Sequence, residues 1–146
     1  MIGFMKYVST TSRCAIQYRG ERLSGSGLNG YQCGYILNIC QNPGVTQDQL
    51  AQQIHVNRSN VTRQLALLEE NGFVERRQSE SDKRVIEVYP TKKATAALPV
   101  VLDVLHEWSD YLTEDFTDEE MDCLKSLLER VTRKAENYAD GMRKKG

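Results

Sequence analysis

A change from helix to β-hairpin within residues 57–94 constrains the fold more than any other feature of the sequence. A helical pattern starts at Asn57 or Arg58 and ends at Gly72, which suits the position after a helix where φ is positive. A strand, a polar tip and a second strand are expected next, at residues 73–78, 79–84 and 85–89. This order predicts a winged helix.

A shorter helix is expected immediately before this one. Thr46 and Gln49 have the spacing of a capping box, and the helix they open places Leu50, Ala51 and Ile54 on one face. Residues 55–57 predict a tight turn. Two helices joined by such a turn form a helix-turn-helix unit.

A further helix is expected upstream of that unit. Asn29 is predicted to cap it, with Gln32 as the reciprocal partner, and it should stop near residues 42–44.

Three amphipathic helices are predicted outside this central part, at about residues 3–23, 91–112 and 117–138. Their apolar residues recur at a spacing of three and four, for example Met121, Leu124, Leu128, Val131, Ala135 and Tyr138 in the last helix. Such stripes need helical partners. We therefore expect a homodimer, with an intramolecular helical bundle as the alternative.

The predicted fold class is mostly α (α+β). Residues 29–90 would form a winged helix-turn-helix domain, and residues 1–28 and 91–146 would form a helical dimerisation region drawn from both chain ends.

The helix after residue 57 has two different faces. At 100° per residue, Val61, Leu65 and Leu68 share one side and are expected to be buried. The opposite side of the first two turns carries short hydrogen-bonding side chains and an arginine, types that reach base edges, at Ser59, Asn60, Thr62 and Arg63. Arg58 suits a phosphate better than a base. A solvated face is the alternative, but such faces usually mix Lys with Glu.

The expected hairpin is rich in basic residues that could contact DNA, namely Arg76, Arg77, Lys83 and Arg84. Asp82 is expected to hold a neighbouring arginine in a fixed orientation. The alternative is a solvated hairpin of mixed charge.

Composition excludes several functional classes. The 146 residues carry a net charge of −1, with acids concentrated after residue 93. Neither a membrane-spanning stretch nor a secretion signal is apparent, so a cytoplasmic location is expected. The four cysteines lack metal-ligand spacing and are expected to be reduced and buried, which argues against zinc. No arrangement suited to catalysis or phosphate binding occurs, so an enzyme is not expected.

Residues 28–94 resemble the MarR family of winged-helix transcriptional regulators. Asp82-Lys83-Arg84, then alternating apolar residues and Thr91, are similar to the wing signature of that family, and residues 67–77 resemble its helix-to-wing junction. Two positions depart from the pattern, since Pro90 replaces a leucine and Ala94 a glycine. Pro90 is expected to shorten the second strand because it lacks an N–H.

The resemblance implies a homodimer that binds a pseudo-palindromic DNA operator. Two recognition helices would enter successive major grooves, and Arg84 would approach a flanking minor groove. It also implies a repressor relieved by a small aromatic or phenolic effector, without any cofactor or metal. Candidate pocket residues are Tyr18, Tyr31, Tyr35 and Trp108. Oxidation of a thiol such as Cys14 is a second sensing mode, although its apolar surroundings favour an inert thiol. A winged helix used only for protein contacts is the alternative function.

Overall fold

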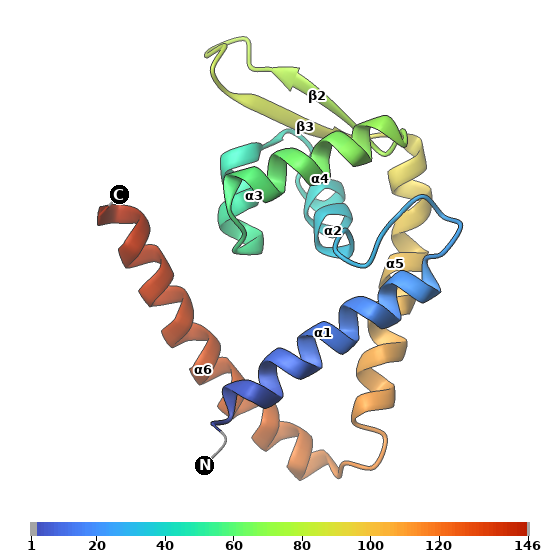
Figure 1. Ribbon diagram of the computed structural model, residues 1–146, viewed down its shortest axis with the longest axis vertical. Helices are drawn as coiled ribbons and strands as arrows, with labels where there is room; N and C mark the ends of the chain where they lie inside the picture. Colours follow the sequence, from blue (N-terminus) through green and yellow to red (C-terminus); the bar gives the residue numbers. More distant parts are fainter. Residues whose placement is uncertain (1–2, 146) are drawn as a thin grey trace. The chain divides into compact units, whose positions relative to one another are not determined.

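The computed structural model describes residues 3–145, in two compact units. The first runs to Trp108 and the second begins at Ser109. The elements are α1 Met5–Arg22, α2 Cys33–Gln41, β1 Val45–Thr46, α3 Gln47–Ile54, α4 Arg58–Glu70, β2 Val74–Gln78, β3 Ile86–Pro90, α5 Lys92–Leu112 and α6 Asp118–Lys145 (Figure 1). The fold is mostly helical with a small three-stranded sheet, which confirms the predicted winged-helix class. None of the described helices is long and apolar enough to cross a membrane.

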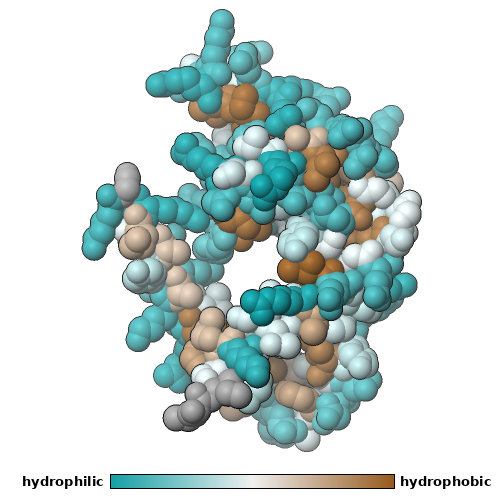
Figure 2. All heavy atoms as spheres, in the orientation of Figure 1, coloured by the Kyte–Doolittle hydropathy of each residue, from teal (hydrophilic) through white to brown (hydrophobic). Residues whose placement is uncertain are grey.

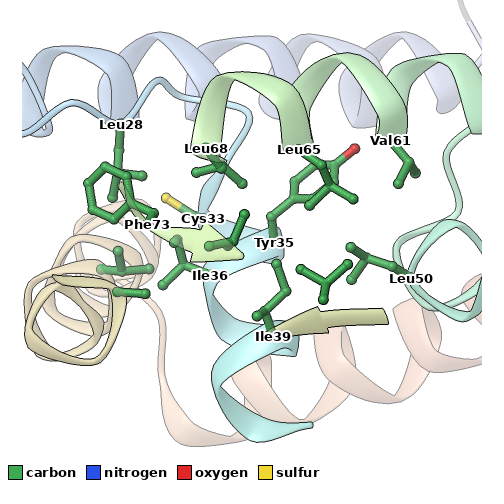
Figure 3. Packing of buried hydrophobic residues seen from close by; sticks show 14 of the residues in the cluster. Leu28, Cys33, Tyr35, Ile36, Ile39, Leu50, Val61, Leu65, Leu68 and Phe73 are labelled. Atoms are coloured by element: carbon green, nitrogen blue, oxygen red, sulfur yellow. The ribbon is translucent and has the colours of Figure 1, made fainter. Parts of the chain in front are cut away.

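The core of the first unit lies under α4. Tyr35 and Ile36 from α2 meet Leu50 from α3 and Leu65 from α4, and each is at most 1% exposed (Figure 3). Burying an aliphatic side chain of this size contributes roughly 1.5–3 kcal/mol. These contacts therefore fix which side of α4 faces outward.

Local hydrogen bonds set both ends of α4. The Asn57 side chain accepts a hydrogen bond from the backbone N–H of Asn60 at 2.7 Å, as an N-cap should. At the other end, Gly72 has a φ of 80°, and the backbone N–H of Phe73 donates to the Leu68 carbonyl at 2.8 Å. This pair of features is a Schellman ending. Both predicted boundaries are confirmed.

The capping box predicted at the start of α3 is present, and a second one forms at the start of α6. Thr46 and Gln49 exchange side-chain and backbone hydrogen bonds in the first, and Thr117 and Glu120 do so in the second. The turn after α3 contains His55 in the left-handed conformation, with a φ of 59°.

The start of α2 differs from the prediction. Asn29 does not cap the helix, because α2 begins only at Cys33 with Gln32 in the N-cap position. The expected hydrogen bond between these two residues does form, with the backbone N–H of Asn29 donating to Gln32 Oε1 at 2.9 Å. This hydrogen bond closes a turn before the helix. The Asn29 side chain accepts a second hydrogen bond within that turn, from the backbone N–H of Tyr31.

The sheet has the order β1-β3-β2, with both pairs antiparallel. Strand β1 was not predicted, and it has only two residues. The expected shortening of the second strand by Pro90 is wrong, because Pro90 belongs to β3 and lies opposite Val74. The ladder bond at this end comes from the backbone N–H of Thr91, which donates to the Phe73 carbonyl at 3.0 Å. The missing N–H of Pro90 lies at a position where β2 needs no donor, so the strand is not shortened.

The junction between α4 and α5 is closed by two side chains. The Thr91 hydroxyl donates to the Gly72 carbonyl at 2.6 Å, and the Lys93 ammonium donates to the Asn71 carbonyl at 2.6 Å. The Lys93 nitrogen also lies 4.4 Å from the centre of the Phe73 ring. The carbonyls of Asn71 and Gly72, the two residues that follow α4, thus accept hydrogen bonds from residues at the start of α5.

The second unit contains the end of α5 and all of α6. Helix α6 runs to Lys145, beyond the expected end near Tyr138. It has no buried residue, and Leu128 and Val131 on its apolar stripe are 45% and 41% exposed. The apolar stripe predicted for this helix is therefore uncovered within the described chain.

The burial expected for all four cysteines is wrong for two of them. Cys33 is buried and Cys40 is half-buried, whereas Cys14 and Cys123 are exposed. The exposed pair lies on α1 and α6, which bury one residue and none, respectively. Burial raises the pKa of the Cys33 and Cys40 thiols, which makes both less reactive.

We expect Gly30→Ala to destabilise the protein. A Cβ at this position would lie 2.2 Å from the backbone oxygen of Ile16, so α1 and the loop would have to separate. A clash with backbone should cost about 2 kcal/mol or more. Gly34→Ala is the matched control, because its Cβ would meet only an Ile54 methyl at 3.8 Å, and alanine favours a helix. Urea denaturation measures both. Equal stability of the two variants would contradict the close approach.

Candidate nucleic-acid interface

The outward face of α4 is the first part of the candidate interface (Figure 1). Val61, Leu65 and Leu68 are at most 1% exposed, as predicted. Ser59, Thr62 and Arg63 are exposed on the other side. This exposed face has hydrogen-bonding groups and one guanidinium in its first two turns, and no carboxylate.

Asn60 does not face outward as fully as the sequence suggested. It is half-buried, and its Oδ1 accepts a hydrogen bond from the Tyr35 hydroxyl at 2.6 Å. Burial raises the pKa of Tyr35 to about 12, although the nearby charge of Arg63 opposes that shift. The phenol therefore stays protonated and donates throughout the neutral range.

Arg58 and the start of α3 border a cavity of about 210 Å³. It lies between the starts of α3 and α4 and the wing, which is the hairpin formed by β2, the tip at residues 79–85 and β3. Arg58 pairs with Asp48 at 3.1 Å, and both side chains are more than half exposed. Thr62 and Arg84 also line this cavity. The structure thus brings together three of the predicted DNA-contacting residues from α4 and the wing.

Two of the basic residues in the hairpin are engaged within the protein, Arg76 by α4 and Arg77 by the hairpin itself. Glu69 accepts three hydrogen bonds from Arg76, two from the guanidinium and one from the backbone N–H. These bonds lower the pKa of Glu69. Arg77 pairs with Glu75 at 2.8 Å, and its guanidinium carbon lies 4.4 Å from the centre of the Tyr89 ring. DNA contact by Arg76 and Arg77 stays a prediction.

The wing tip presents a guanidinium to solvent. The Asp82 carboxylate accepts hydrogen bonds from the backbone N–H of Arg84 at 3.0 Å and from its guanidinium at 3.1 and 3.2 Å. The side-chain hydrogen bond from Arg84 lowers the pKa of Asp82, so this carboxylate remains ionised. The Arg84 side chain is 91% exposed, Lys83 is exposed, and hydrophilic side chains project from this tip in Figure 2. The predicted support of an arginine by Asp82 is confirmed as a contact.

The candidate effector residues have different surroundings. Tyr18 stacks on Trp108 with ring centres 4.7 Å apart, and its hydroxyl donates to Glu107, which also pairs with Arg22. Tyr35 is buried against Asn60, whereas Tyr31 is 60% exposed. The structure therefore joins two of the four, Tyr18 and Trp108, at the contact between α1 and α5.

A buried polar pair was missed in the sequence. Gln64 on α4 accepts hydrogen bonds from the Gln32 amide at 3.0 Å and from the Asn29 amide at 3.3 Å. Gln32 is 1% exposed and Gln64 is 7% exposed. The burial of Gln64 could have been predicted from the helical wheel, because Gln64 falls about 60° from Val61 and so lies beside the buried face of α4.

Comparisons with known proteins point to one family. The MarR family model matches residues 32–86. The HTH-type transcriptional regulator YybA of Bacillus subtilis is 30% identical over 102 residues, which cover 70% of this chain and 68% of YybA. The transcriptional repressor MprA of Escherichia coli is 28% identical over 133 residues, or 90% of this chain and 73% of MprA.

Solved structures agree with this result. A crystal structure of MarR superposes with a TM-score of 0.82 at 30% identity, covering 92% of this chain and 98% of that one. A MarR-family regulator from Listeria monocytogenes, solved in complex with 26mer DNA, has a TM-score of 0.87 at 21% identity, covering 99% and 96%. The chain belongs to the MarR family of winged helix-turn-helix transcriptional regulators.

Proposed function

We propose that this regulator binds specific DNA sequences as a homodimer and acts as a repressor. The observation that carries the proposal is the outward face of α4, free of carboxylates in its first two turns, beside a wing tip with an exposed Arg84. Base edges would be contacted from Ser59, Asn60, Thr62 and Arg63, and phosphates from Arg58. The Listeria relative bound to DNA and the repressor MprA support this function.

The uncovered helices support the homodimer. Helix α6 buries none of its described residues, and Phe4 and Tyr7 on the α1 side are 58% and 66% exposed. Exposed apolar stripes at helical spacing are typical of an association surface. A twofold dimer presents two copies of α4, which suits a pseudo-palindromic operator.

Relief by a small aromatic or phenolic molecule is the regulatory part of the proposal. Its support is the stack of Tyr18 on Trp108, which brings two aromatic rings together at the contact between α1 and α5. No cofactor is required for the proposed function. A repressor binds chromosomal DNA, so the protein would act in the cytoplasm.

Salt dependence tests the DNA-binding proposal. The logarithm of the binding constant should fall steeply with the logarithm of the salt concentration, because each neutralised phosphate releases counterions. Arg84→Ala should reduce this slope by roughly one for each protomer. Fluorescence anisotropy with a duplex selected from genomic fragments measures both.

Arg13→Ala is the matched control, since it removes the same charge from an exposed position on α1. It should leave the slope unchanged. If the wild-type protein shows no salt-sensitive binding to any genomic fragment, the DNA-binding proposal is wrong. The alternative function, a winged helix used only for contacts with other proteins, would then apply.

A further inference from the structure

We propose that Tyr35 is a positioning residue for DNA recognition. Its hydroxyl holds the side-chain carbonyl of Asn60, so that Asn60 offers only N–H donors to a base and selects guanine over adenine. This inference rests on the proposed function, because it concerns how α4 reads a duplex.

The contact lies where the core meets the reading face. Tyr35 belongs to α2 and is 1% exposed, so its ring is fixed by packing. Figure 3 shows its hydroxyl pointing toward α4. The distance from the hydroxyl oxygen to Asn60 Oδ1 is 2.6 Å, which is a short hydrogen bond. The backbone N–H of Asn60 is held separately by Asn57.

The rest of the Asn60 amide remains available. Its Nδ2 has no hydrogen-bond partner among residues 3–145, and the side chain is half-exposed. Arg63 lies one turn further along α4, and its charge acts on the Tyr35 hydroxyl. The outward side of the first two turns of α4 therefore carries two kinds of donor, the Arg63 guanidinium and the Asn60 amide N–H₂.

This arrangement changes what an asparagine can read. Asparagine usually selects adenine by two bonds, with Oδ1 accepting from N6–H₂ and Nδ2 donating to N7. That pairing needs both amide atoms in the plane of the base. An Oδ1 bonded to a buried hydroxyl is turned toward the core, so only Nδ2 reaches the groove. Guanine presents two acceptors, O6 and N7, and suits a group that only donates.

Protonation keeps the arrangement in place. The pKa of Tyr35 is raised to about 12 by burial, so the hydroxyl donates at every pH at which the protein would work. The base preference should therefore be the same at pH 6 and pH 9.

Selection of bound duplexes from random DNA tests the inference in the full-length protein. Asn60→Ala first identifies the position that Asn60 reads, as the position that loses its preference. At that position the wild-type protein should favour guanine. Tyr35→Phe should shift the ratio of adenine to guanine there by about tenfold, because it frees Oδ1. Tyr111→Phe, which removes the hydroxyl of a ring on α5 that is 63% exposed, is the matched control and should cause no shift.

Each outcome decides a different claim. An unchanged preference in a folded Tyr35→Phe variant overturns the role of Tyr35 while the DNA-binding function stands. A wild-type preference for adenine at the Asn60 position also overturns it, and this measurement needs no substitution in the core. Enrichment of no sequence by the wild-type protein overturns the proposed function, and this inference with it.

Discussion

Arg63→Ala is expected to weaken binding to a selected operator on the order of 10³-fold, since each half-site loses a guanidinium contact worth about 1–3 kcal/mol. Arg63 is exposed at the centre of the outward face of α4, and a single arginine can bond guanine through two parallel N–H groups. Fluorescence anisotropy at one fixed salt concentration measures the loss.

Arg63→Lys separates charge from geometry. Lysine keeps the positive charge but lacks the planar fork, so binding to unrelated duplexes should persist while the preference for the operator falls. Thermal unfolding should be unchanged in both variants, because the side chain is exposed. Equal preference for the operator in the wild-type protein and Arg63→Ala would show that Arg63 contacts no base.

The second large effect is expected from Leu128→Asp combined with Val131→Asp, which should convert the proposed dimer to monomers. Both side chains are more than 40% exposed in the single chain, on the apolar stripe of α6. Burial of such side chains contributes roughly 1.5 kcal/mol or more each, so loss of two from each protomer should raise the dissociation constant about 10⁴-fold. Sedimentation equilibrium measures the mass.

Ser126→Asp combined with Arg130→Gln is the matched control. It changes the net charge by the same −2 on the opposite side of α6, so it should leave the dimer intact. A Leu128→Asp and Val131→Asp protein that remains folded and dimeric would contradict the proposed association surface. A monomeric variant should also lose cooperative binding to the two half-sites.

Features that depend on neighbouring residues could be predicted from the sequence. The caps at Thr46, Asn57 and Thr117 need partners only three residues away, and Gly72 needs only its own freedom at positive φ. The same is true at the wing tip, where Asp82 and Arg84 are two residues apart. The order of elements and the buried side of α4 followed from such local signals.

Features that depend on distant contacts could not be predicted. Asn60 is turned by Tyr35, which lies 25 residues earlier in the chain, and no periodicity reports that bond. Strand β1 is two residues long and exists only because β3 pairs with it. The sequence also does not show that Arg76 donates three hydrogen bonds to Glu69, which occupy its guanidinium and its backbone N–H.

The closed junction between α4 and α5 makes α4 a lever. Thr91 and Lys93 hold the carbonyls of Gly72 and Asn71, directly after α4, so any movement at the start of α5 is applied to that end of the helix. The arm from the junction to the first turn of α4 is about 20 Å, at 1.5 Å for each of its 13 residues. A tilt of about 5° at the junction then displaces Ser59 and Asn60 by about 1.5 Å, enough to break a hydrogen bond to a base.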